Sequence, residues 1–122
     1  IQGKTKLEAE KILEDAISVQ ESGAFSVVLE GIPTDLAIKI TNTLDIPTIG
    51  IGAGLNCDGQ IQVYHDILGL YGDIIPRHTK RYANFGIEIQ QKLAKYKSEV
   101  EAKIFPTQQH SAINSSQTVK TD

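Results

Sequence analysis

The chain has 122 residues, 40% of them hydrophobic and 22% charged, with a formal net charge of −3. This length and composition predict one globular domain with a core of its own. A slightly acidic chain gives no electrostatic reason to expect a nucleic acid partner, and no apolar run reaches the roughly 18 residues that suggest a membrane span. The one cysteine, Cys57, cannot form an internal disulfide, which favours a reducing compartment and an inert thiol.

The first helix is expected to begin at Thr5 and to end at Gly23. Thr5 and Glu8 form a Thr-x-x-Glu capping box, and apolar residues then recur at helical spacing as far as Ile17. Glycine tolerates the left-handed conformation that ends many helices. Residues 24–29 follow as an almost continuous apolar run, which is typical of a parallel strand buried on both faces.

A second helix and strand come next. Pro33 and Asp35 suit the start of a helix, and residues 48–52 are apolar enough for another buried strand. The apolar side of this helix is expected to consist of Leu36, Ala37, Ile40 and Leu44. The order helix, strand, helix, strand with short links predicts an α/β fold with a parallel sheet.

Residues 58–70 fit either a strand or a helix. As a strand, residues 61–66 have one tolerable apolar face. Two observations favour a helix: a polar stripe of helical period runs through this segment, and the link from Gly52 is shorter than the dozen or so residues of a parallel crossover. We therefore expect a helix that is capped by Asp58 and ends near Gly69, followed by a short strand near residues 74–80.

The last helix is expected to cover residues 82–100, where apolar side chains recur in steps of three and four. Beyond Pro106 the sequence becomes rich in Gln, Ser, Thr and Asn. Such a composition predicts disorder. The expected organisation is thus one folded region, residues 1–105, and a disordered tail, residues 106–122.

Glu30 is the strongest candidate for a catalytic side chain. It directly follows an apolar run that is expected to be a parallel strand, and parallel α/β enzymes place their active sites at the carboxyl ends of strands. Apolar neighbours such as Val28, Leu29 and Ile32 are expected to desolvate the carboxylate and make it a better base. The alternative is an ordinary solvated acid in a loop.

The glycines of residues 50–54 have two interpretations. They resemble a phosphate-binding loop, which would make the chain a nucleotide-binding module. The dinucleotide fingerprint, however, requires a glycine where Leu55 stands, and a helix directly afterwards. Close packing of the backbone at a strand end is therefore the favoured interpretation.

The histidines give weak signals. His65 and Asp66 are possible metal ligands, but neighbouring residues of a helix point about 100° apart. Partial burial with a hydrogen bond is therefore the favoured interpretation of this pair. His78 and His110 have no evident partner in the sequence.

Six short segments occur in a distinctive order and spacing. They are residues 2–5 (Gln-Gly-Lys-Thr), 27–33 (Val-Val-Leu-Glu-Gly-Ile-Pro), 46–54, 57–60, 65–70 (His-Asp-Ile-Leu-Gly-Leu) and 80–83. Together they resemble the ketopantoate hydroxymethyltransferase family, and the resemblance extends from Ile1 to about Ser111. Two small departures are His78-Thr79, where Phe-Val is commoner, and Gln109, where an acid is usual.

The resemblance implies a (β/α)8 barrel of the TIM type, of which this chain is the incomplete C-terminal part. It implies transfer of a hydroxymethyl group from 5,10-methylenetetrahydrofolate to 3-methyl-2-oxobutanoate (2-oxoisovalerate). The product is 2-dehydropantoate (ketopantoate), in the first committed step of pantothenate biosynthesis. The family's general base is the glutamate of a Leu-Glu-x-Ile/Val-Pro motif, which corresponds to Glu30. Family members use Mg²⁺ and form oligomers, so a cytoplasmic homo-oligomer is expected.

The family's metal-binding acids and its substrate-binding lysine lie in earlier strands, so no residue here is assigned a metal role. Residues 1–4 contain neither a start methionine nor a signal peptide, as expected for part of a longer protein. We expect this chain alone to be inactive. The alternative function is a catalytically inactive barrel fragment that acts only as an interaction or regulatory partner.

Overall fold

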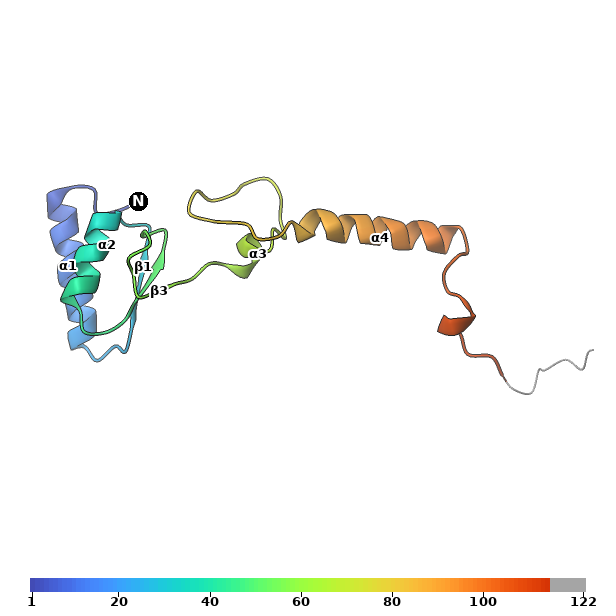
Figure 1. Cartoon of the computed structure of the whole chain (residues 1–122), viewed down its shortest axis with the longest axis horizontal. Helices are drawn as coiled ribbons and strands as arrows, with labels where there is room; N and C mark the ends of the chain where they lie inside the picture. Colours follow the sequence, from blue (N-terminus) through green and yellow to red (C-terminus); the bar gives the residue numbers. More distant parts are fainter. Residues whose placement is uncertain (115–122) are drawn as a thin grey trace, which may run out of the picture.

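The first half of the chain folds into an α/β unit, and the second half runs out from it (Figure 1). The structure is a computed structural model that describes residues 1–114. The α/β unit contains α1 (Lys6–Glu21), β1 (Val27–Glu30), α2 (Thr34–Thr43), β2 (Thr48–Ile51) and β3 (Gly59–Gln60). It is followed by α3 (Tyr64–Ile67), α4 (Phe85–Glu101) and a 3-10 turn, η1 (Gln108–His110).

Helix α1 begins and ends as its sequence predicts. The Thr5 hydroxyl accepts a hydrogen bond from the Glu8 amide at 3.3 Å, and the Glu8 carboxylate accepts one from the Thr5 amide at 3.2 Å. Gly23 follows the last turn with a φ of 95°, in the left-handed region that favours glycine. The capping box and the glycine stop are both confirmed.

The predicted parallel sheet is confirmed, with the strand order β1-β2-β3. Val27 pairs with Thr48 and Glu30 with Ile51, so β1 and β2 end side by side. The third strand was not expected: Gly59 pairs in parallel with Ile49. A parallel strand must start again at the opposite end of its neighbour. Because β3 has only two residues and pairs with the middle of β2, the short loop of residues 52–58 is long enough to return the chain to that point.

The helix predicted to start at Asp58 is therefore wrong. The Asp58 carboxylate accepts hydrogen bonds from the amide and the hydroxyl of Thr48, at 2.9 and 3.2 Å. It ties the loop to the start of β2 and caps no helix. The helical part of this segment, α3, begins only at Tyr64, and Gly69 follows it with a φ of 61°.

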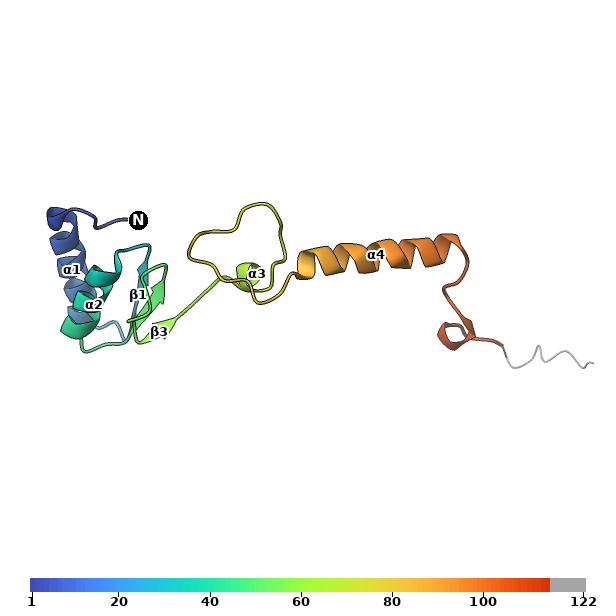
Figure 2. The same ribbon diagram turned by 45° about the horizontal axis from the view of Figure 1, so that its top comes forward.

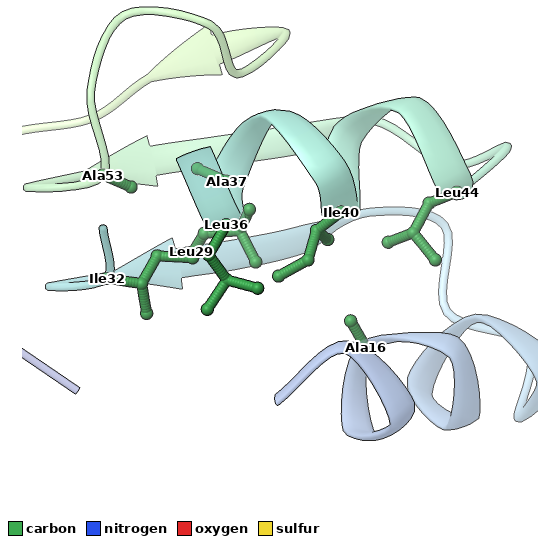
Figure 3. Close-up of a cluster of buried hydrophobic side chains, with 8 residues drawn as sticks. All are labelled: Ala16, Leu29, Ile32, Leu36, Ala37, Ile40, Leu44 and Ala53. Atoms are coloured by element: carbon green, nitrogen blue, oxygen red, sulfur yellow. The ribbon is translucent and has the colours of Figure 1, made fainter. Parts of the chain in front are cut away.

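The core lies on one face of the sheet, where α1 and α2 cover it (Figure 3). The buried side chains are Ala16, Leu29, Ile32, Leu36, Ala37, Ile40, Leu44 and Ala53. The predicted apolar side of α2 is thus confirmed. The other face of β1 has no such cover, because Val28 is 55% exposed. The prediction of a strand buried on both faces is wrong for the described chain, and the strand begins only at Val27.

No strand forms at residues 74–80. Ile74 and Ile75 are exposed, and Pro76 accepts a hydrogen bond from the Thr79 amide at 2.9 Å in a tight turn. The prediction of a last strand is wrong. It relied on the apolar pair Ile74 and Ile75, which lies in a loop.

Helix α4 confirms the predicted long helix, although it begins three residues late. The amides of Tyr82 and Phe85 donate to the carbonyls of Ile67 and Leu68, which ties the start of α4 to α3. No residue of α4 is buried. Within residues 1–114, no helix is both long and apolar enough to cross a membrane.

The segment predicted to be a disordered tail contains η1. The Thr107 hydroxyl and His110 Nδ1 lie 2.8 Å apart in a hydrogen bond, so His110 has a partner that the sequence did not suggest. Residues 108–110 form this turn, and the disorder of the tail as a whole stays a prediction. The rest of the predicted tail, residues 115–122, lies outside the described residues.

Candidate active site

Glu30 is the last residue of β1, at the carboxyl edge of the sheet, as predicted. It pairs with Ile51 of β2, and the next residue, Gly31, donates its amide to the Ile51 carbonyl at 2.9 Å. Two parallel strands thus end together beside one carboxylate. This edge is where parallel α/β enzymes bind their ligands.

The expected desolvation of Glu30 does not occur within the described chain. Side chains alternate along a strand, so Leu29 points into the core while Val28 and Glu30 lie on the uncovered face. Glu30 is exposed, and Ile32 is buried on the helix side. Water can be removed from this carboxylate only by a group that covers this face, such as a bound ligand or a further part of the protein.

A surface hollow of about 570 Å³ surrounds the end of β1. We call it the Glu30 hollow; its lining includes Glu30, Gly31, Thr34, Gly52, Arg77 and His78. The volume falls within the range of about 300–1,000 Å³ that is usual for small-molecule sites. Three segments that are distant in sequence therefore meet where β1 and β2 end.

His78 reaches this site although the sequence indicated no partner for it. Gly52 directly follows β2 with a φ of 65°, and a β-carbon placed there would lie 3.2 Å from both Cβ and Cγ of His78. A side chain at position 52 would therefore require the histidine to shift slightly. The only sequence signal was the departure from the family's commoner phenylalanine at position 78.

The glycines of residues 50–54 serve close packing, which confirms the favoured interpretation. A β-carbon at Gly50 would lie 2.9 Å from the sulfur of Cys57. One at Gly54 would lie 2.6 Å from the Thr34 side chain. The Cys57 side chain packs against the core.

Asp66 is buried and accepts a hydrogen bond from the Tyr71 hydroxyl, while His65 is exposed. The structural interpretation is confirmed for Asp66 and is wrong for His65, which is not buried. The hydrogen bond to Asp66 is the main cause that raises the pKa of Tyr71 above its ordinary value, and Arg81 acts in the opposite direction. Arg81 also donates to the Tyr71 carbonyl at 2.6 Å. These contacts fix the loop between α3 and α4.

Among residues 1–114, no three His, Cys, Asp or Glu side chains gather closely enough to hold a metal ion. A magnesium ion needs several oxygen ligands at one point, with carboxylates among them. The described residues alone therefore do not fit the Mg²⁺ that the family resemblance implies.

The fold and the site define a class: a mixed α/β protein with a parallel sheet and an acid at a strand end, consistent with part of a TIM-barrel enzyme. Sequence comparison names the family. The family profile described as ketopantoate hydroxymethyltransferase matches residues 1–108. The chain belongs to this family.

Two relatives show how much of such a protein is present. The 3-methyl-2-oxobutanoate hydroxymethyltransferase of Chloroflexus aurantiacus is 53% identical over 112 residues, which are 92% of this chain and 40% of the relative. The protein of the same name from Clostridioides difficile is 49% identical over 121 residues, 98% of this chain and 44% of the relative. The names of both describe transferases. The chain thus spans less than half the length of these relatives.

Proposed function

We propose that this chain supplies the C-terminal part of the barrel of a ketopantoate hydroxymethyltransferase. The complete protein would transfer a hydroxymethyl group from 5,10-methylenetetrahydrofolate to 3-methyl-2-oxobutanoate, giving 2-dehydropantoate for pantothenate synthesis. The observation that carries the proposal is the position of Glu30 at the carboxyl end of β1, on a hollow of small-molecule size. The relatives named for this reaction, about half identical in sequence, support it.

Glu30 is the proposed proton acceptor. Its carboxylate removes the proton from C3 of 3-methyl-2-oxobutanoate, the carbon next to the ketone, and leaves an enolate. The enolate carbon then forms a bond to the one-carbon unit, and water supplies the new hydroxyl group. The two carbon–nitrogen bonds that held this unit break, and tetrahydrofolate leaves with one proton from Glu30 and one from the water. Glu30 is exposed within the described chain, so the bound reactants and the rest of the barrel would have to exclude water from it.

The other expectations from the resemblance belong to the complete protein. A Mg²⁺ ion would stabilise negative charge on the ketone oxygen. The described residues do not supply its ligands, so we assign no step of this chain through it. Assembly as a homo-oligomer and a cytoplasmic location remain predictions.

The test of Glu30 uses a fusion protein, in which the part of the Chloroflexus aurantiacus relative that precedes the matched region is joined to Ile1. Solvent deuterium exchange at C3 of 3-methyl-2-oxobutanoate, without folate, reports proton removal directly. Glu30→Gln is expected to slow this exchange roughly 10²- to 10⁴-fold while KM changes little, because the amide cannot accept the proton.

The matched control is Glu14→Gln, which makes the same chemical change at an exposed position of α1. It should leave the exchange rate unchanged. Exchange at the wild-type rate in Glu30→Gln would remove Glu30 from the mechanism. A wild-type fusion that folds but shows no exchange would favour the alternative, a fragment that acts only as an interaction or regulatory partner.

A further inference from the structure

The tight turn of residues 76–79 brings two further side chains to the Glu30 hollow. The loop between α3 and α4 reaches back toward the sheet in both views (Figures 1 and 2). At its tip the Thr79 amide donates to the Pro76 carbonyl, and Arg77 and His78 line the hollow. The role proposed for Glu30 uses neither of them.

His78 anchors this turn. Its side chain packs against Gly52, which directly follows Ile51, the partner of Glu30 in the sheet. The contact is tight, because a β-carbon at position 52 would lie 3.2 Å from the His78 side chain. Because Arg77 precedes His78 in the same turn, this packing holds the arginine at the hollow too.

The charge of Arg77 is not neutralised within the described chain. The ion pairs among residues 1–114 are Lys6 with Glu10 and Lys97 with Glu101, both on exposed helix surfaces. Glu30 lines the same hollow without coming within 4.0 Å of the guanidinium. A guanidinium stays charged at any ordinary pH, and its fork of N–H groups matches a carboxylate.

We propose that Arg77 binds a carboxylate of a reactant at the Glu30 hollow, with His78 as the residue that positions it. This inference rests on the proposed function, which brings two carboxylate-bearing reactants to the site: 3-methyl-2-oxobutanoate, with one carboxylate, and tetrahydrofolate, with its glutamyl carboxylates. Either would meet a cation beside the proposed base.

The test compares Arg77→Gln with Lys80→Gln in the fusion protein. Lys80 belongs to the same loop and carries the same charge, but its ammonium group lies 5.0 Å from the centre of the Tyr82 ring. Loss of a charge-assisted hydrogen bond is expected to raise one KM by about 10- to 100-fold in Arg77→Gln. The rate constant of C3 exchange at saturation should stay near wild type, and Arg77→Lys should fall between the two.

The two sources of the carboxylate give different results. If Arg77 holds the keto acid, the KM for 3-methyl-2-oxobutanoate rises in the exchange assay without folate. If it holds the folate, exchange is unaffected and only the KM for methylenetetrahydrofolate rises. Both KM values within twofold of wild type, or an equal rise in Lys80→Gln, would overturn the proposal.

His78 is tested through Arg77. His78→Ala should raise the same KM as Arg77→Gln does, and the double variant should show no further rise. His78→Phe should keep that KM near wild type, because it retains a ring.

Calorimetric titration with 3-methyl-2-oxobutanoate and with tetrahydrofolate separates this proposal from the role of Glu30. If the wild-type fusion binds a reactant in an Arg77-dependent way but shows no C3 exchange, only the mechanism proposed for Glu30 is refuted. If wild type and Arg77→Gln bind both reactants equally well, the carboxylate site is refuted.

Discussion

The charged residues at the candidate site are exposed, whereas the charged residue that holds the neighbouring loop is buried. Glu30 and Arg77 lie at the Glu30 hollow with their charges exposed. Asp66, by contrast, is 7% exposed and satisfied by the Tyr71 hydroxyl. A buried carboxylate that has a hydrogen-bond donor stabilises the local structure. Its hydrogen bond can be measured through the pKa of the donor, Tyr71.

The pKa of Tyr71 is raised above its ordinary value, chiefly by the hydrogen bond to Asp66. Because the folded-state pKa lies above the ordinary value, the stabilisation from this bond is fully present below about pH 10 and is lost as the pH rises through the raised pKa. Asp66→Asn removes the negative charge, so the pKa of Tyr71 should fall toward its ordinary value.

The measurement is an ultraviolet titration of phenolate absorbance in the fusion protein, with Tyr71→Phe identifying the contribution of Tyr71. Asp73→Asn removes an exposed carboxylate from the same loop and serves as the control. Identical titration curves for Asp66→Asn and wild type would show that the hydrogen bond does not govern Tyr71.

At the scale of elements, β3 is held by very little backbone pairing and depends on Asp58. The Asp58 carboxylate accepts from the amide of Thr48, a residue with no exposed surface at the start of β2. The Thr48 hydroxyl has a second partner, the Thr41 hydroxyl at 2.8 Å, but its amide depends on Asp58.

Asp58→Ala is therefore expected to lower the free energy of unfolding by about 1–3 kcal/mol, since it leaves the Thr48 amide buried without an acceptor. Asp58→Asn retains an acceptor oxygen and should lose less. Urea unfolding of the fusion protein measures both, and Asp45→Ala, at an exposed acid preceding the same strand, is the control. Equal losses in Asp58→Ala and Asp45→Ala would contradict the role given to Asp58.

Elements with local signals could be predicted from sequence, and those that depend on distant contacts could not. The capping box at Thr5 and the periodic stripe of α4 are encoded within a few turns, so both helices were found. Asp58 resembles a helix cap, and only its bond to Thr48 shows otherwise. His78 meets Gly52 through a loop whose path no local pattern specifies. The position of Glu30 at the end of β1 was predicted correctly because a strand end is a local feature.

For the whole molecule, the main feature is apolar surface without a partner in the described chain. On the uncovered face of β1, Val28 is 55% exposed. On α4, the exposed apolar residues are Phe85, Ile87, Ile89, Leu93, Tyr96 and Val100. The sheet of three strands also has two open edges. Monomeric proteins rarely expose continuous apolar surfaces of this kind, and open strand edges invite pairing with other chains.

The 122-residue chain alone is therefore expected to self-associate, and the N-terminal part of the Chloroflexus aurantiacus relative, co-expressed or fused, is expected to prevent it. The physical reason follows from the proposed barrel: three strands cannot close into one, so β1 would lack an opposite wall until the other strands are supplied. Size-exclusion chromatography and urea unfolding of the chain with and without its partner measure the effect. Rescue should also restore C3 proton exchange, because Glu30 would then face the rest of the site. If the chain without its partner is monodisperse and unfolds in one cooperative transition, the partial-barrel interpretation is contradicted. Residues 1–114 would then have to contain a domain that is stable by itself.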